Sequence, residues 1–119
     1  MKLEGPLQDG SYAFSLRIIK MYHVLSEERH EKVLAKQILR SGTSIGANVS
    51  ESRFAASKPD FRSKLTIALK EANETDYWLN LLHDSGYLTN EEFASLDKDL
   101  TSLINMLVKS LKTTQRGEK

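Results

Sequence analysis

The chain has 119 residues, a length that fits one domain with a single hydrophobic core. Its composition, 39% hydrophobic and 28% charged, is ordinary for a globular protein and argues against disorder. The sequence has no cysteine, which excludes disulfides, thiolate catalysis and zinc sites that need sulfur. No apolar run approaches the roughly 20 residues that span a bilayer, and residues 1–6 lack the apolar segment of a secretion signal. We therefore expect a soluble, cytoplasmic protein with no membrane partner.

Charge is divided unevenly along the chain, although the net charge is only +1. Residues 1–70 contain 12 Lys/Arg and 7 Asp/Glu, a balance of +5, whereas residues 71–119 contain 5 and 9, a balance of −4. One interpretation is that two basic helices pack beside two acidic ones. The other is that the basic part forms a patch for an acidic partner, or pairs with the acidic part of a second copy.

A first helix is predicted over residues 11–28. Five apolar residues recur there at helical spacing and form one stripe: Phe14, Ile18, Met21, Tyr22 and Leu25. A second stripe of Tyr12, Leu16 and Ile19 lies on roughly the opposite side. A helix on the outside of a bundle needs only one apolar stripe, so the second stripe predicts a subunit interface. The alternative is a scatter of singly exposed apolar residues, which is common in proteins.

A second helix is predicted over residues 31–56. Gly42 and Gly46 lie inside it, where each glycine costs about 1 kcal/mol relative to alanine. Close approach of another helix is the usual reason for such glycines. Gly42, Gly46 and Ser50 are small residues spaced four apart, and they predict that approach here.

Two capping boxes mark the starts of the third and fourth helices. Ser57 with Asp60 precedes a long periodic segment that ends at Gly86, and Thr89 with Glu92 precedes the last one.

Four helices joined by short turns predict the fold class: an all-α, antiparallel up-down-up-down four-helix bundle. We expect a flexible N-terminal segment over residues 1–10, the bundle over residues 11–112 and a polar C-terminal tail over residues 113–119.

Polar side chains stand out on the second and third helices. Glu71, Glu74 and Trp78 share one flank of the third helix, and a carboxylate enclosed there needs hydrogen-bond donors. We interpret the set as a structural polar layer that fixes helix register, made of Gln37, Arg40, Ser44, Asn48, Glu51, Glu71, Glu74 and Trp78. The alternative is that Glu71 and Glu74 are a general acid/base pair. No nucleophile accompanies them, so the sequence predicts no catalytic residue.

A metal site is tested by ligand spacing. A di-iron centre in a four-helix bundle needs two Glu-x-x-His pairs, and this chain has one, from Glu27 to His30, at a predicted helix junction. Phosphate-loop, dinucleotide and hydrolase motifs are absent. We therefore predict no metal, no cofactor and no small-molecule substrate.

Basic residues gather around the turn between the second and third helices. Arg53, Lys58, Arg62 and Lys64 make this turn the best local candidate for a phosphate-binding patch, and hence for binding RNA or DNA. Such a cluster is more often a solvated surface. In a ring of subunits a weak patch repeats and gains affinity through multivalency.

Two motifs carry a family resemblance. The segment QILRSGTSIGANVSE, residues 37–51, resembles the signature of the 23S rRNA intervening-sequence proteins, a four-helix bundle family also called the S23 ribosomal protein family. Asp60-Phe61, Lys64-Leu65 and ALKEANETDYWL, residues 68–79, resemble its second block, and Gly86-Tyr87-Leu88 resembles the turn that follows. The resemblance covers about residues 10–112, and the paired motifs are specific.

The resemblance implies an up-down bundle that assembles as a homopentameric ring. It also implies a link to nucleic acid, since some family members are encoded within insertions of bacterial 23S rRNA genes, and related accessory proteins of diversity-generating retroelements bind nucleic acid. It implies no catalytic residues. We therefore expect a non-enzymatic homo-oligomer that binds RNA or DNA, the alternative being a protein–protein interaction scaffold that binds no nucleic acid.

Overall fold

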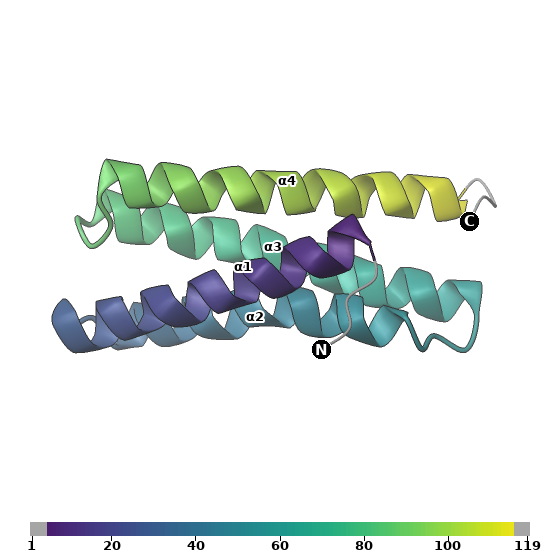
Figure 1. Ribbon diagram of the computed structural model, residues 1–119, viewed down its shortest axis with the longest axis horizontal. Coiled ribbons are helices and arrows are strands. Elements are labelled where there is room, and N and C mark those ends of the chain that lie inside the picture. Colours follow the sequence, from purple (N-terminus) through teal and green to yellow (C-terminus); the bar gives the residue numbers. More distant parts are fainter. Residues whose placement is uncertain (1–4, 116–119) are drawn as a thin grey trace.

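Four α-helices account for most of residues 5–115, the part of the chain that the computed structural model describes, and no strand occurs there. The helices are α1 (Pro6–His23), α2 (Val33–Ser52), α3 (Lys58–Asp84) and α4 (Asn90–Gln115), and a π-helical turn, η1 (Val24–Glu28), continues α1. They lie side by side along a 46 Å long axis (Figure 1). The predicted all-helical bundle is therefore confirmed.

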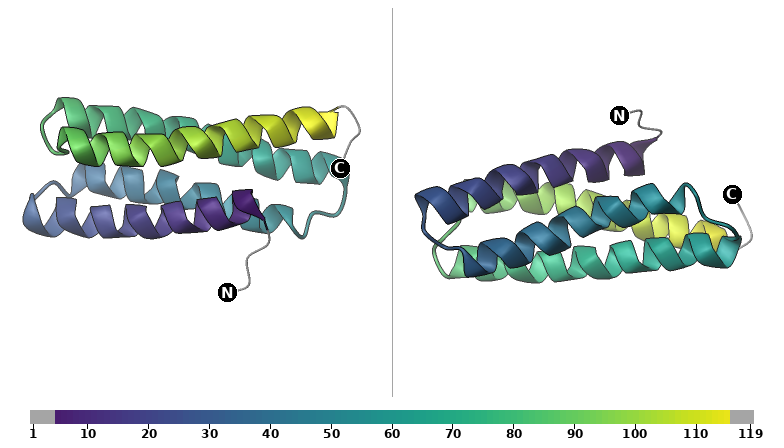
Figure 2. Two further views of the ribbon diagram at one scale, coloured as in Figure 1. Left: turned by 45° about the horizontal axis from the view of Figure 1, so that its top comes forward. Right: turned by 90° about the horizontal axis from the view of Figure 1, so that it is seen from below.

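Different turns and helix termini meet at each end of the bundle. The turn between η1 and α2 and the turn between α3 and α4 lie at one end (Figures 1 and 2). The turn between α2 and α3 lies at the other end, together with the end of α4, and α1 begins part-way along the bundle on the side of that end (Figures 1 and 2). Residues far apart in the sequence are thus brought to a common end.

The first helix begins earlier than the sequence predicts. Pro6 occupies the first turn of α1, where its missing N–H is not needed, and residues 6–10 of the predicted N-terminal segment belong to this helix. Gly10 is accommodated inside the helix because the backbone there packs closely on Leu103 of α4. At the other terminus α4 continues to Gln115. Residues 1–4 and 116–119 of the predicted terminal segments lie outside the described residues.

The second helix is shorter than predicted. It ends at Ser52 because the N–H groups of Arg53, Phe54 and Ala55 each bond to the carbonyl three residues back, at 3.0–3.3 Å, which tightens the chain into turns. It begins at Val33 because the Glu31 carboxylate accepts the Leu34 N–H at 3.0 Å and so acts before the helix rather than within it.

The predicted caps are present. Ser57 Oγ accepts the Asp60 N–H at 3.2 Å, and the Asp60 carboxylate reaches back to the Ala56 N–H at 3.0 Å. Thr89 and Glu92 bond each other's N–H groups reciprocally, at 3.1 and 2.9 Å.

The end of α3 is formed, as predicted, with Gly86 in the turn that follows the helix. This glycine has φ +89°, a conformation that L side chains rarely adopt, and its N–H bonds to the His83 carbonyl at 3.0 Å.

One core runs between the helices, and α1 crosses α2 at the two glycines. A Cβ at Gly42 would lie 2.9 Å from Ile18 Cγ1, and one at Gly46 would lie 3.0 Å from Ser15 Oγ. This confirms the predicted close approach. The apolar side chains buried between the helices are Phe14, Ile18, Leu25, Ala35, Ile38, Ile45, Val49, Leu65, Ala68, Ala72, Leu79, Leu82, Leu88, Leu96, Leu100, Leu103 and Leu107.

None of the described helices is both long and apolar enough to cross a membrane.

Candidate functional site

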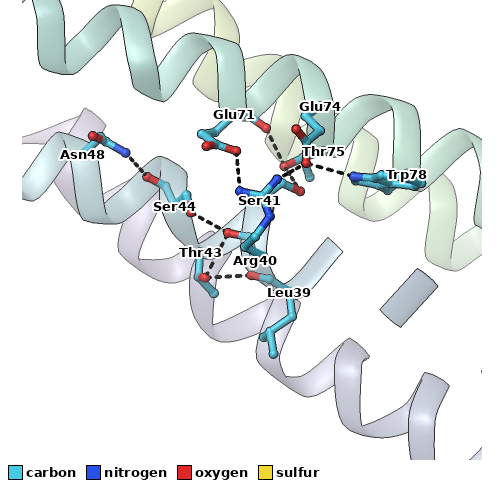
Figure 3. Close-up of polar contacts among 10 residues, drawn as sticks. All are labelled: Leu39, Arg40, Ser41, Thr43, Ser44, Asn48, Glu71, Glu74, Thr75 and Trp78. Atoms are coloured by element: carbon cyan, nitrogen blue, oxygen red, sulfur yellow. Dashed lines mark hydrogen bonds and ion pairs between the residues drawn. The ribbon is translucent and has the colours of Figure 1, made fainter. Parts of the chain in front are cut away.

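An ion cluster joins α2 to α3 on the outside of the bundle (Figure 3). Arg40 forms ion pairs with both Glu71, at 3.5 Å, and Glu74. Trp78 Nε1 donates to the same Glu74 oxygen at 3.2 Å. Glu71 Oε1 is buried without a hydrogen bond, so its attraction to Arg40 is coulombic. Both carboxylates are thus held by one guanidinium that spans the two helices.

A second contact beneath this cluster is fully buried. Thr75 Oγ1 hydrogen-bonds with Ser41 Oγ at 3.0 Å and with the Glu71 carbonyl at 2.8 Å (Figure 3). A hydroxyl pair inside an otherwise apolar contact favours one helix register, because a slip would separate the two hydroxyls and leave Ser41 Oγ buried without this partner. Sequence reasoning did not assign Ser41 and Thr75 to the polar layer, although a polar residue at a core-facing position of each helix was the available signal.

The other predicted members of the polar layer form no hydrogen bond or ion pair between the two helices within the described part of the chain. Ser44 and Asn48 hydrogen-bond within α2, to the Arg40 carbonyl at 2.6 Å and the Ser44 carbonyl at 2.8 Å. Gln37 and Glu51 are exposed. The described residues contain no group of three His, Asp or Glu that could hold a metal ion.

The four basic residues predicted at the α2–α3 turn point to different sides of the bundle. Arg53 lines a groove between α1 and α2, and its guanidinium carbon lies 5.5 Å from the centre of the Phe54 ring. Arg62 donates to the Leu111 carbonyl in the last turns of α4 at 2.6 Å. Lys64 lies seven residues before Glu71 and therefore on the α3 face that meets α2. Lys58 is exposed at the first position of α3.

Charge is separated more strongly between the two ends of the bundle than between pairs of helices. We call residues 5–10, 51–64 and 107–115 the basic end, which carries six Lys/Arg and three Asp/Glu, a balance of +3. We call residues 24–32 and 83–92 the acidic end, which carries two Lys/Arg and six Asp/Glu, a balance of −4. The helices themselves differ less: α1 and α2 each carry a balance of +1, and α3 and α4 each carry −1, which agrees with the interpretation of two basic helices beside two acidic ones.

The acidic end is organised by one ion pair. Both guanidinium nitrogens of Arg29 donate to the two carboxylate oxygens of Glu92 at 2.8 Å, and Arg29 also donates to the Tyr87 carbonyl at 2.7 Å. The hydrogen bond from Arg29, helped by those from Thr89 and opposed by burial, lowers the pKa of Glu92 to about 2. The same pair raises the pKa of Arg29. This pair ties the segment after η1 to the start of α4.

The stripe that the sequence predicts as an interface is exposed on the surface of the chain. Tyr12, Leu16 and Ile19 are 39%, 55% and 41% exposed on the outer side of α1. Two of them, Tyr12 and Ile19, line the groove between α1 and α2, whose volume is about 270 Å³. The groove lining is mostly apolar and small, and consists of Gln8, Ser11, Tyr12, Ser15, Ile19, Thr43, Gly46, Ala47, Val49, Ser50 and Arg53.

Comparison with known families decides what kind of protein this is. A model of the 23S rRNA-intervening sequence protein family matches residues 7–109. The chain belongs to this family. Among solved structures, the chain is similar to a protein of unknown function from the S23 ribosomal protein family of Bacteroides thetaiotaomicron, with 49% identity and a TM-score of 0.90. That match covers 91% of this chain and 100% of the other. No curated protein matches.

Proposed function

We propose that this protein is a non-enzymatic, homo-oligomeric module that binds RNA or DNA through the basic ends of its bundles. The observation that carries the proposal is the separation of charge along the long axis, with +3 at one end and −4 at the other. A chain with a net charge of +1 can then present a locally positive surface to a phosphate backbone.

Assembly would strengthen such a weak surface. The exposed stripe of Tyr12, Leu16 and Ile19, beside an open apolar groove, supports a contact between copies, because contiguous apolar surface on a small protein usually marks an interaction site. The protomer proposed for this assembly is an antiparallel up-down-up-down bundle, and the proposed assembly is the pentameric ring that the family resemblance implies. Copies arranged with their basic ends on one face would bind nucleic acid multivalently.

In this proposal the polar layer has a structural role and not a catalytic one. Glu71 and Glu74 both pair with Arg40, and Glu74 also accepts from Trp78. A general acid or base has to reach a substrate proton, whereas these carboxylates are engaged in joining two helices.

The test is binding of the full-length protein to a structured RNA hairpin, a single-stranded RNA and a DNA duplex across a salt series. The variant at the basic end is K64E/K109E, and the matched control is K36E/K70E, which makes the same charge change at exposed sites outside both the basic and the acidic end. Removing one lysine–phosphate pair should reduce the slope of log affinity against log salt by roughly 0.7–0.9. We expect the basic-end variant to bind at least about tenfold more weakly at low salt, and the control within about threefold of wild type, because only the first reverses two charges on the binding surface of each copy.

Two results would overturn the proposal. Equal loss of affinity in both variants would show that only net charge matters. Absence of binding at low salt for every probe would favour the alternative, a protein–protein interaction scaffold.

A further inference from the structure

The groove between α1 and α2 is an incomplete apolar site. Its floor is formed by small residues of α2, Gly46, Ala47 and Ser50, and its walls by Tyr12 and Ile19 of α1. Gly46 is essential to this shape because α1 already approaches it closely, with the Ser11 carbonyl oxygen 3.2 Å from where a Cβ would stand. The volume of about 270 Å³ is larger than a cavity of roughly 150 Å³ that accepts a benzene ring.

The groove also contains a buried polar atom without a hydrogen-bond partner. Gln8 Oε1 is buried and has no hydrogen-bond partner among the described residues, although Gln8 lines the groove. Arg53 lines the groove as well and supplies a cation there. An occupant that combines an aromatic ring with a nearby acidic group would suit both the apolar floor and this cation.

Such a group stands on the same chain just beyond α2. Phe54 is 80% exposed, more than any other large hydrophobic side chain of the described residues. It is not on a loose loop, because its N–H bonds to the Glu51 carbonyl at 3.0 Å and its ring lies against Arg53. An aromatic side chain with two rotatable bonds, held on an ordered turn, loses little entropy when it inserts into a site.

We propose that Phe54 of one copy seats in the α1–α2 groove of the next copy. This inference rests on the proposed self-assembly and names its anchor residue. The Glu51 carboxylate is exposed one helical turn before Phe54, so insertion would bring it towards the partner's Arg53, and the partner's Arg53 towards the inserted ring. Each copy offers one ring and one groove, so the contact repeats from copy to copy.

The test is the mass of the full-length protein in solution, measured by sedimentation velocity over a concentration series. The F54A variant removes the ring, and A47W fills the groove from an exposed position that does not touch the core. The control is V33A, which removes an apolar side chain that is 71% exposed at the start of α2, near the other end of the bundle. We expect F54A and A47W to raise the concentration needed for assembly by about 10- to 100-fold, the effect of exposing one aromatic side chain to water, and V33A to leave it unchanged.

Mixing the two variants tests direct contact. F54A keeps an intact groove and A47W keeps an intact Phe54, so a mixture of the two is expected to form a one-to-one pair that neither variant forms alone. Failure of the mixture to pair would overturn the groove as the seat of Phe54. Circular dichroism of each variant must show wild-type helicity, and L16D serves as the probe of the exposed stripe outside the groove.

The outcomes separate this inference from the proposed assembly. If L16D loses mass but F54A assembles as wild type does, the assembly stands and the role of Phe54 is refuted. If wild type is monomeric at every concentration, the assembly itself fails.

Discussion

The ion pair at the acidic end gives a prediction whose size can be worked out. Replacing Glu92 with Gln keeps an oxygen that can accept the Thr89 N–H of the capping box, but it removes the charge that Arg29 binds with both guanidinium nitrogens. The substitution therefore tests the charged pair while leaving the helix start in place.

The magnitude follows from the pKa. The hydrogen bonds from Arg29 lower the pKa of Glu92 from its ordinary value of 4.5 to about 2. At about 1.4 kcal/mol per pKa unit this shift corresponds to roughly 3.5 kcal/mol of linkage. The side chains of Arg29 and Glu92 are 31% and 27% exposed, so solvent screening reduces the figure, and we expect Glu92→Gln to cost about 1–2 kcal/mol at pH 7. For about 100 residues this corresponds to a Tm lower by roughly 4–10 °C.

The lowered pKa also predicts in which direction the stability of the protein changes with pH. A carboxylate whose pKa is lowered on folding stabilises the protein above its unfolded pKa, and the stabilisation is lost as pH falls through the folded pKa. Wild type should therefore lose stability between pH 4.5 and about 2, while the variant changes less over the same range. The assay is urea denaturation at several pH values, at one protein concentration because assembly would shift the midpoint.

The control is Glu91→Gln, an exposed acid in the same first turn of α4 with the same charge change. It should cost under about 0.5 kcal/mol, the usual range for an exposed surface change. Equal losses in both variants, or a difference between wild type and Glu92→Gln that persists undiminished at pH 2, would refute the reasoning.

Further predictions concern two glycines and one histidine. Gly42→Ala should destabilise by about 1–2 kcal/mol because its Cβ would lie 2.9 Å from Ile18. Gly10→Ala should be neutral or stabilising by about 0.5 kcal/mol, since it gains helix propensity and its Cβ would meet only the side-chain ends of Leu103, at 3.3 Å, and Met106, at 3.5 Å. Urea midpoints that fall below that of wild type by the same amount in both variants would contradict this. Hydrogen bonds with Asn90 and then Asp84 raise the pKa of His83, so its contribution to stability is present at low pH and lost as pH rises through that pKa. His83→Gln should flatten the fall in Tm between pH 6 and about 8, and identical slopes would count against this role.

Local sequence signals were sufficient to recognise the four helices and their caps, but not all of the helix bounds. The Thr89–Glu92 box and the positive φ at Gly86 depend on residues a few positions apart, so they can be recognised without knowing the fold. The start of α1 was missed because the apolar residues that predict this helix begin at Tyr12, whereas the packing around Gly10 depends on α4, more than 90 residues later.

The candidate surfaces could be predicted only in part, because they depend on how distant segments meet. Arg62 reads as one of four neighbouring cations, but it is engaged by the Leu111 carbonyl of another helix. The charged ends combine segments separated by about 50 residues, so counting charges in two halves of the sequence could not reveal them. Phe54 was expected inside the second helix and instead stands on the turn after it.

The most direct test of the central claim is photo-crosslinking of the assembled protein to a structured RNA hairpin, followed by identification of the crosslinked peptides. We predict crosslinks within residues 51–64 and 107–115, which lie together at the basic end. Crosslinks confined to residues 24–32 and 83–92, or spread evenly over the bundle, would contradict binding through the basic end.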